Sequence, residues 1–146
     1  RDDQPMQTGA TVLSLPVGEA MTHGVINCPP ETPLRTVARM MATHRVHCVA
    51  VHGELGWGVV SDLDLIASAG LDVDERTAGH ASSSPAITVQ PEETLERAAQ
   101  LMSENETTHL IVVDAVTGNP LGVISTIDIA RVLATEQGRF DYGPTS

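Results

Sequence analysis

Apolar residues recur along this chain with two spacings, one helical and one typical of short strands. Helical spacing (i, i+3, i+4, i+7) occurs twice, and each occurrence is followed by a short apolar run, "CVAV" or "LIVV". Because such stripes are typical of a helix face packed on other elements, we expect them to lie in the core. The two stripes consist of Leu34, Val37, Ala38 and Met41, and of Leu95, Ala98, Ala99 and Met102.

The two stripes belong to an internal repeat. The segment "PPETPLRTVARMMATHR" (Pro29 to Arg45) aligns with "QPEETLERAAQLMSENE" (Gln90 to Glu106) at an offset of 61 residues. Further on, "GVVSDLDLIA" aligns with "GVISTIDIAR" at an offset of 64, and upstream "VGEAMT" corresponds to "AGHASS". The growing offset predicts three extra residues in the second copy, inside a hairpin turn at "DAVTGNPLG".

Both copies predict the same order of elements. A short strand and a proline-led helix precede two strands of a hairpin, and a second helix begins just after a serine. The order is therefore β-α-β-β-α with a short helical lead-in, and the predicted class is α/β (α+β). The predicted strands are "VINC", "CVAVH" and "WGVVS" in the first copy, and "AITV", "LIVVD" and "LGVIS" in the second.

Charge and composition restrict the function. The chain of 146 residues carries 19 acidic and 8 basic residues, a net charge of −11, and every basic residue is arginine. Nucleic-acid binding depends on cation–phosphate contacts, so this balance disfavours it. The apolar runs are too short to span a membrane, and we expect no membrane association. Cys28 and Cys48 lie in apolar stretches and are expected to be buried thiols, although a disulfide or metal pair is an alternative. A reducing, cytoplasmic setting follows.

The chain shows no pattern that would support catalysis. It contains no nucleophile elbow, phosphate-binding Walker loop or His-Glu metal motif. The six histidines have no spacing typical of metal ligands, so we expect no metal site and no catalytic cofactor. The sequence therefore predicts a protein that is not an enzyme.

The ordered pattern resembles a known family. A segment of the form "MT…V…P…TL…A…M", then a hairpin and G-h-h-S-x-x-D (h, apolar), occurs twice and resembles a tandem pair of cystathionine β-synthase (CBS) domains, called a Bateman module. The resemblance runs from about Val17 to Ala134. It implies two repeats packed about a pseudo-twofold axis, assembly into a homodimer, and regulation of a partner protein. The boundaries we expect are an N-terminal arm at 1–15, CBS repeat 1 at 16–69, a linker at 70–76, CBS repeat 2 at 77–135 and a C-terminal tail at 136–146.

The family's ligands are adenosine-containing: AMP, ADP, ATP or S-adenosylmethionine, bound in clefts between the repeats. The chain departs from the family pattern at the first hairpin strand, where Ala50 and Ile111 replace a common proline near the adenine. Ser82 and Ser83 also stand where the first copy has Met21 and Thr22. These departures leave the shape of the adenine pocket, and the identity of the nucleotide, open.

Each Ser-x-x-Asp corner has two interpretations. In the first it is a capping box, in which Ser accepts from a first-turn N–H and Asp reaches back to the cap. In the second, which the family pattern favours, the helix N-terminus and Ser face a phosphate while Asp accepts from the ribose hydroxyls. The two interpretations are compatible, with the cap present when the site is empty.

The two corners differ by one residue. Arg131 lies three residues after Asp128 and can reach a phosphate, whereas Ala67 holds the equivalent place after Asp64. By the family's swapped geometry, the Asp128 corner faces the first copy. The main cleft is expected to comprise Thr22, Val25, Ile26, His47, Val49, Ala50, Ser125, Asp128 and Arg131. A second, weaker cleft is expected to comprise Ser61, Asp64, Ser83, Ala86, Thr108 and His109.

The sequence therefore predicts a regulatory module that binds an adenosine-containing small molecule between its repeats. Occupancy would change the dimer geometry or act on a partner protein. The alternative is a ligand-independent dimerisation or scaffold module in which both corners are helix caps alone.

Overall fold

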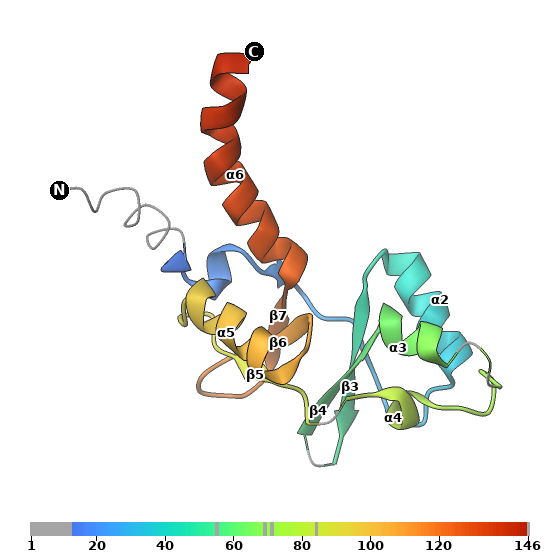
Figure 1. Cartoon of the computed structure of the whole chain (residues 1–146). Helices are drawn as coiled ribbons and strands as arrows, with labels where there is room; N and C mark the ends of the chain where they lie inside the picture. Colours follow the sequence, from blue (N-terminus) through green and yellow to red (C-terminus); the bar gives the residue numbers. More distant parts are fainter. Residues whose placement is uncertain (1–12, 55, 69, 71, 84, 146) are drawn as a thin grey trace. The chain divides into compact units, whose positions relative to one another are not determined.

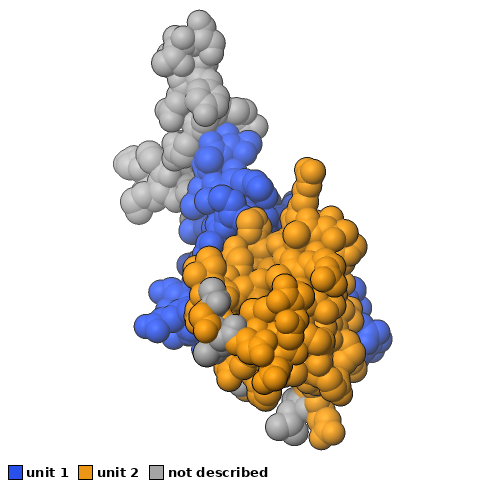
Figure 2. Space-filling view, turned by 90° about the vertical axis from the view of Figure 1, so that its right-hand side faces the viewer, with its two compact units in different colours: residues 1–24, 87–146 blue, residues 25–86 orange. Residues whose placement is uncertain are grey.

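The computed structural model describes residues 13–54, 56–68, 70, 72–83 and 85–145, the last ten by their backbone alone. The chain forms two compact units (Figure 2). Unit 1 comprises residues 1–24 and 87–146, and unit 2 comprises residues 25–86. Unit 2 is thus one continuous segment, and unit 1 is built from the two ends of the chain.

Unit 1 contains a four-stranded mixed sheet in the order β1-β7-β6-β5. β5 runs parallel to β6, and the other neighbours are antiparallel. α5 packs beside β6, and α6 follows directly on β7 (Figure 1). The elements are the 3₁₀ helix η1 (Val17–Glu19), β1 (Thr22–His23), β5 (Thr88–Val89), α5 (Leu95–Asn105), β6 (His109–Val113), β7 (Pro120–Ser125) and α6 (Thr126–Thr145).

Unit 2 contains a three-stranded sheet in the order β2-β3-β4, with β2 parallel to β3 and β3 antiparallel to β4. α2 packs on β3, and α3 follows directly on β4 (Figure 1). The elements are β2 (Asn27–Cys28), α2 (Leu34–His44), β3 (Cys48–Gly53), β4 (Gly56–Ser61), α3 (Asp62–Ala67) and α4 (Ala78–Ala81). The predicted class and the β-α-β-β-α order are confirmed in both copies.

Equivalent residues of the two copies make equivalent backbone hydrogen bonds. Gly18 N donates to Pro91 O at 2.9 Å in unit 1, and Gly79 N donates to Pro30 O at 2.8 Å in unit 2. Both pairs keep the offset of 61 residues that the sequence shows. The offset rises to 64 within the hairpin of the second copy, because the turn between β6 and β7 holds the extra residues, as predicted. The repeat is therefore one supersecondary unit built twice.

The first helix of each repeat, α2 or α5, ends in the same left-handed turn. Arg45 (φ 56°) ends α2 and Glu106 (φ 53°) ends α5, at equivalent positions of the repeat. A residue with positive φ stops the helical path, and its N–H satisfies one of the last carbonyls. The turn sends the chain straight into the first hairpin strand, which fixes where the corner residues lie.

The apolar stripes form the cores of the two units. Leu34, Val37 and Met41 lie in the core of unit 2. The equivalent Leu95, Ala98 and Met102 lie in the core of unit 1. One residue of the prediction is wrong: Ala38 is exposed. Ala38 is not among the residues packed on the core of unit 2, whereas the equivalent Ala99 is half-buried against the core of unit 1.

The lead-in segment of each repeat completes the sheet of the other repeat. In unit 1, Thr22 pairs antiparallel with Val123 of β7. In unit 2, the equivalent Ser83 forms a bridge with Val59 of β4. The glycine of G-h-h-S lies beside this pairing in both copies. A Cβ on Gly58 would come within 3.1 Å of Ser83 O, and one on Gly122 would meet Thr22 O more closely still.

Two segments differ from, or extend beyond, the sequence-based expectations. α6 continues through most of the segment expected as a C-terminal tail, as far as Thr145. The predicted N-terminal arm lies mostly outside the described residues. Cys28 and Cys48 are both free and buried, as their apolar surroundings predict.

Candidate functional site

The Ser125 corner of unit 1 is a complete capping box. Ser125 ends β7 and α6 begins at the next residue, so the serine stands at the helix entrance. Asp128 N donates to Ser125 Oγ at 3.3 Å, while Asp128 Oδ2 accepts from Ser125 N at 2.9 Å and from Ser125 Oγ at 3.0 Å. Both residues are buried, at 7% and 5% exposure. The carboxylate is therefore held rigidly by one of its two oxygens.

Arg131 contacts the other carboxylate oxygen. Its Nη1 lies 3.4 Å from Asp128 Oδ1, one helical turn along α6. The Arg131 side chain is 70% exposed, whereas that of Asp128 is 6% exposed. The pair joins a fixed, buried anion to a solvated cation at a long distance, which is typical of a weak interaction.

The Ser61 corner of unit 2 has the same local hydrogen bonds. Asp64 Oδ2 accepts from Ser61 N at 2.8 Å and from Ser61 Oγ at 3.0 Å, and Asp64 N donates to Ser61 Oγ at 3.2 Å. Both residues are half-buried, and α3 is six residues long. Ala67 occupies the place of Arg131, so this corner has no cation on its helix face.

Sequence reasoning missed one pair at the unit 2 corner. His47 Nδ1 lies 3.0 Å from Asp62 Oδ2, with both side chains exposed. Asp62 N also donates to His47 O at 2.9 Å, as Thr126 N does to Thr108 O at 3.1 Å in unit 1. This symmetric backbone bond is what brings the first residue of α3 and of α6 beside the start of the preceding hairpin. No local spacing in the sequence indicates it.

Unit 1 brings together residues from both predicted clefts. Thr22 lies on β1 opposite Val123, two residues before Ser125. His109 lies opposite Ser125 in the β6–β7 register, and Thr108 Oγ1 lies 2.8 Å from His109 Nδ1. Thr108 and His109 were expected with the Asp64 corner. The structure shows that they adjoin the Ser125 corner.

The remaining predicted residues belong to unit 2. Ala50 N donates to Ile26 O at 2.9 Å, and half-buried Val25 directly precedes Ile26. Val49 is fully buried in the core of unit 2. Its side chain is therefore enclosed by the core of unit 2.

Two further predicted residues adjoin β4. Ser83 exchanges backbone hydrogen bonds with Val59, and Ala86 N donates to Trp57 O at 2.6 Å. Ser83 and Ala86 thus both lie beside β4. These two residues accompany the strand that leads into the Ser61 corner.

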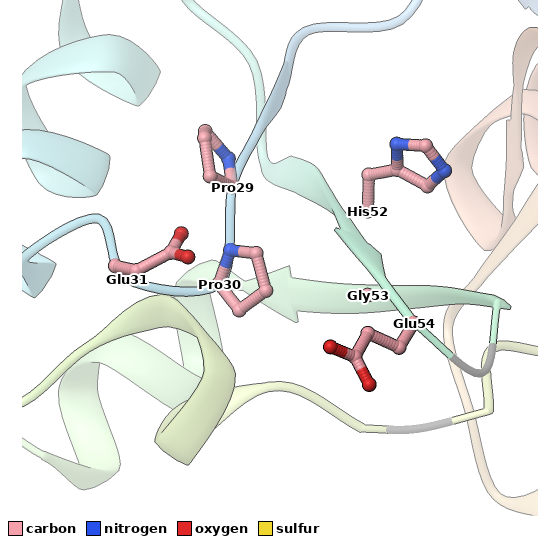
Figure 3. Close-up of a pocket in the computed structure, with 6 residues that line it drawn as sticks. All are labelled: Pro29, Pro30, Glu31, His52, Gly53 and Glu54. Carbon is pink, nitrogen blue, oxygen red and sulfur yellow. The ribbon is translucent and has the colours of Figure 1, made fainter.

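An open hollow of about 540 Å³ lies in unit 2, away from the predicted residues. Figure 3 shows the carboxyl groups of Glu31 and Glu54 near Pro30, with His52 on the neighbouring strand. The His52 ring stacks on Trp57 with the ring centroids 4.5 Å apart. Two exposed carboxylates would repel a phosphate, so the chemistry of this hollow does not suit a nucleotide.

The described residues include no cluster of three or more histidine, cysteine or acidic side chains placed to hold a metal ion. Within the same residues, no helix combines the length and apolar character needed to cross a bilayer.

Comparison with known proteins identifies the fold. The CBS domain profile matches residues 17–69 and 78–135, most of the chain. The chain belongs to the CBS domain family. It carries two such domains, the tandem arrangement that its repeat predicts, and it is hereafter called the CBS pair.

One curated relative is the uncharacterized protein MK0525 of Methanopyrus kandleri. It is 29% identical over 124 residues, which cover 82% of the CBS pair and 63% of the relative. The CBS pair thus spans less than two thirds of that protein's length.

Solved structures share the fold at low sequence identity. The CBS domain of a bacterial CNNM/CorC family Mg²⁺ transporter in complex with ATP has a TM-score of 0.73 at 20% identity, with 91% of the CBS pair and 96% of that chain covered. The CBS domain pair of protein MJ0100, in complex with 5′-methylthioadenosine and S-adenosyl-L-methionine, has a TM-score of 0.74 at 17% identity, with 83% and 97% covered. A hexameric CBS-CP12 protein from bloom-forming cyanobacteria has a TM-score of 0.74 at 22% identity, with 81% and 67% covered.

Proposed function

We propose that the CBS pair is a regulatory, non-catalytic module that binds an adenosine-containing ligand at the Ser125–Asp128 corner. Its function is signal transduction: ligand occupancy changes the geometry of a homodimer or the activity of a partner protein. Two structural neighbours with adenosine ligands support the ligand class. The single observation that carries the proposal is the hydrogen bonding of the Asp128 carboxylate: Ser125 holds one oxygen, and Arg131 contacts the other.

Asp128 combines rigidity with one accessible acceptor. Its Oδ2 is occupied by Ser125, and the geometry of the cap fixes the carboxylate plane. Its Oδ1 contacts the weakly held Arg131. A ribose diol needs a fixed acceptor that receives two O–H donors, and Oδ1 has the lone pairs to do so. The start of α6 and Arg131 provide positive potential for a phosphate nearby.

The proposed residues divide by unit. Four of them belong to unit 1: Thr22, Ser125, Asp128 and Arg131. Their contacts support the proposed binding of the ribose and the phosphate of the ligand. The contributions of Val25, Ile26, His47 and Ala50 in unit 2 rest on the family resemblance. The Asp64 corner is the weaker candidate because it has no arginine and its helix is short.

The test is calorimetric titration of nucleotide-free protein with AMP, ADP, ATP and S-adenosylmethionine. Asp128→Asn is the informative variant because its amide oxygen can still accept from Ser125 N, while its NH₂ presents donors to the ribose hydroxyls. Asp64→Asn is the matched control. We expect saturable binding that falls by about tenfold or more in Asp128→Asn and stays near wild type in Asp64→Asn. Binding unaffected by Asp128→Asn would refute this location.

A scaffold that binds no ligand is the second candidate. Both corners are complete capping boxes, and apolar side chains stand exposed next to them: Leu63 at 62%, Ile66 at 68% and Ile127 at 51%. Leu63 and Ile127 are equivalent in the repeat, and such residues favour contact with another protein surface. A stable dimer that gives no heat with any of the four ligands, and that Leu63→Ser with Ile127→Ser dissociates, would support this candidate instead.

A further inference from the structure

We propose that Arg131 selects ligands that carry a phosphate, so that the corner accepts nucleoside phosphates and rejects uncharged or sulfonium adenosine derivatives. This inference rests on the proposed function, because it concerns the same corner. It depends on the position of Arg131 beside Asp128 Oδ1, the carboxylate oxygen that the capping box does not use.

Arg131 and a bound ribose would compete for that oxygen. Asp128 Oδ2 already accepts two hydrogen bonds from Ser125, so ligand hydroxyls must use Oδ1, where Arg131 Nη1 lies at 3.4 Å. A ribose that donates to Oδ1 weakens or displaces the contact with the guanidinium. The cost is small because Arg131 is 70% exposed and the pair is long.

Once a ribose has displaced Arg131 from Asp128 Oδ1, the interaction that replaces this contact depends on the ligand. A phosphate presents charged acceptors that match the planar guanidinium fork, and such charge-assisted pairs are among the strongest hydrogen bonds. Adenosine or 5′-methylthioadenosine offers no anion, so the guanidinium gains nothing. S-adenosylmethionine places a sulfonium cation beside the ribose, which the guanidinium repels, and its one carboxylate is offset by the ammonium group next to it.

Because the chain is strongly acidic, binding of a phosphate at this corner depends on Arg131. With a net charge of −11, the CBS pair repels anions at long range, and an anionic ligand needs a cation at the site. Among the residues of unit 1 whose side chains the structure describes, the arginines are Arg97 and Arg131. Arg97 lies on α5, 3.9 Å from Glu93, and not on the helix that carries the Ser125–Asp128 corner.

The experiment compares adenosine with AMP by calorimetric titration of wild type and three variants. Arg131→Gln removes the charge but keeps length and donors, Arg131→Lys restores a charge, and Arg97→Gln removes the same charge elsewhere in unit 1. We expect AMP to bind wild type at least about tenfold more tightly than adenosine. Arg131→Gln should bring the two affinities to within about threefold by weakening AMP, while Arg131→Lys recovers part of the preference and Arg97→Gln keeps it.

The outcomes separate this inference from the proposed function. If adenosine and AMP bind wild type equally, and Asp128→Asn weakens both, the proposed function holds and the selector role is wrong. An AMP preference that persists in Arg131→Gln also overturns the selector role. If wild type binds no adenosine compound, both proposals fail together. Increasing salt should weaken AMP binding to wild type and leave adenosine binding nearly unchanged.

Discussion

The backbone carbonyl of Thr22 occupies the place where a side chain on Gly122 would begin. β1 can pair with β7 at this register because residue 122 has no Cβ. The equivalent Gly58 stands against Ser83 O in unit 2 with slightly more room. The glycine of each G-h-h-S segment therefore faces the backbone of a lead-in segment, and at Gly122 that backbone leaves no room for a Cβ.

Gly122→Ala should destabilise unit 1. The added methyl group must displace the backbone of β1, which we expect to cost about 1–3 kcal/mol, as for other overpacked sites. Gly58→Ala should cost less, and Gly70→Ala, whose Cβ would meet open space, should be nearly neutral. Urea unfolding midpoints of the three variants measure this order. A Gly122→Ala protein as stable as Gly70→Ala would show that β1 does not pair at this register.

Asp128→Ala should lower the free energy of unfolding more than Asp64→Ala. Both changes remove a capping box, but Asp128 is buried and its loss leaves Ser125 N without an acceptor inside the protein. Such a loss costs about 1–3 kcal/mol, whereas at the half-buried Asp64 water can replace the carboxylate. Chemical denaturation of both variants, without ligand, tests the difference. Equal losses would contradict the burial argument.

Asp114 should make stability pH-dependent. Thr117 N and Val116 N donate to its carboxylate, which lowers the pKa of Asp114 below its ordinary value of 3.8. Because the folded pKa is the lower one, the stabilisation is present above pH 3.8 and is lost as the pH falls through the folded value. Asp114→Ala should therefore be less stable than wild type near neutral pH, and the two should converge in acid. A difference that is constant with pH would argue against this cause.

The two cysteines should react slowly in the folded protein. Burial, with a smaller effect of the Asp62 charge, raises the pKa of Cys48 to about 12, and burial also raises the pKa of Cys28. Both thiols are thus protonated at neutral pH, and the thiolate is the reactive form. Titration with a disulfide reagent should detect few thiols in native protein and both in denaturant. Rapid reaction of native Cys48 would contradict its burial.

Sequence reasoning succeeded where a feature depends on residues close in the chain. The capping boxes and the Arg131–Asp128 contact join residues three apart, and helical geometry alone places such residues together. The helices, hairpins and the extra turn residues followed from the repeat. The stripes were buried as predicted except Ala38, because periodicity gives the direction of a side chain but not whether a neighbour reaches it.

Features that depend on register were beyond the sequence. The His47–Asp62 pair joins residues 15 positions apart, across the hairpin. The burial of Val49 depends on which face of β3 the helices cover, and an unbroken apolar strand such as "CVAV" does not indicate that face. Residues whose contacts depend on strand register therefore needed the structure for their placement.

The exchange of lead-in segments also determines the order in which the chain can fold during synthesis. Residues 25–86 contain every strand and helix of unit 2, so its hydrogen bonds can form while residue 87 onward is still being added. η1 and β1 are made before unit 2, but their partners, Pro91, Glu93 and Val123, are made only after it. This lead-in segment is therefore fixed later than unit 2, although it is made earlier, and during that interval its apolar Val17 has no core of unit 1 to enter.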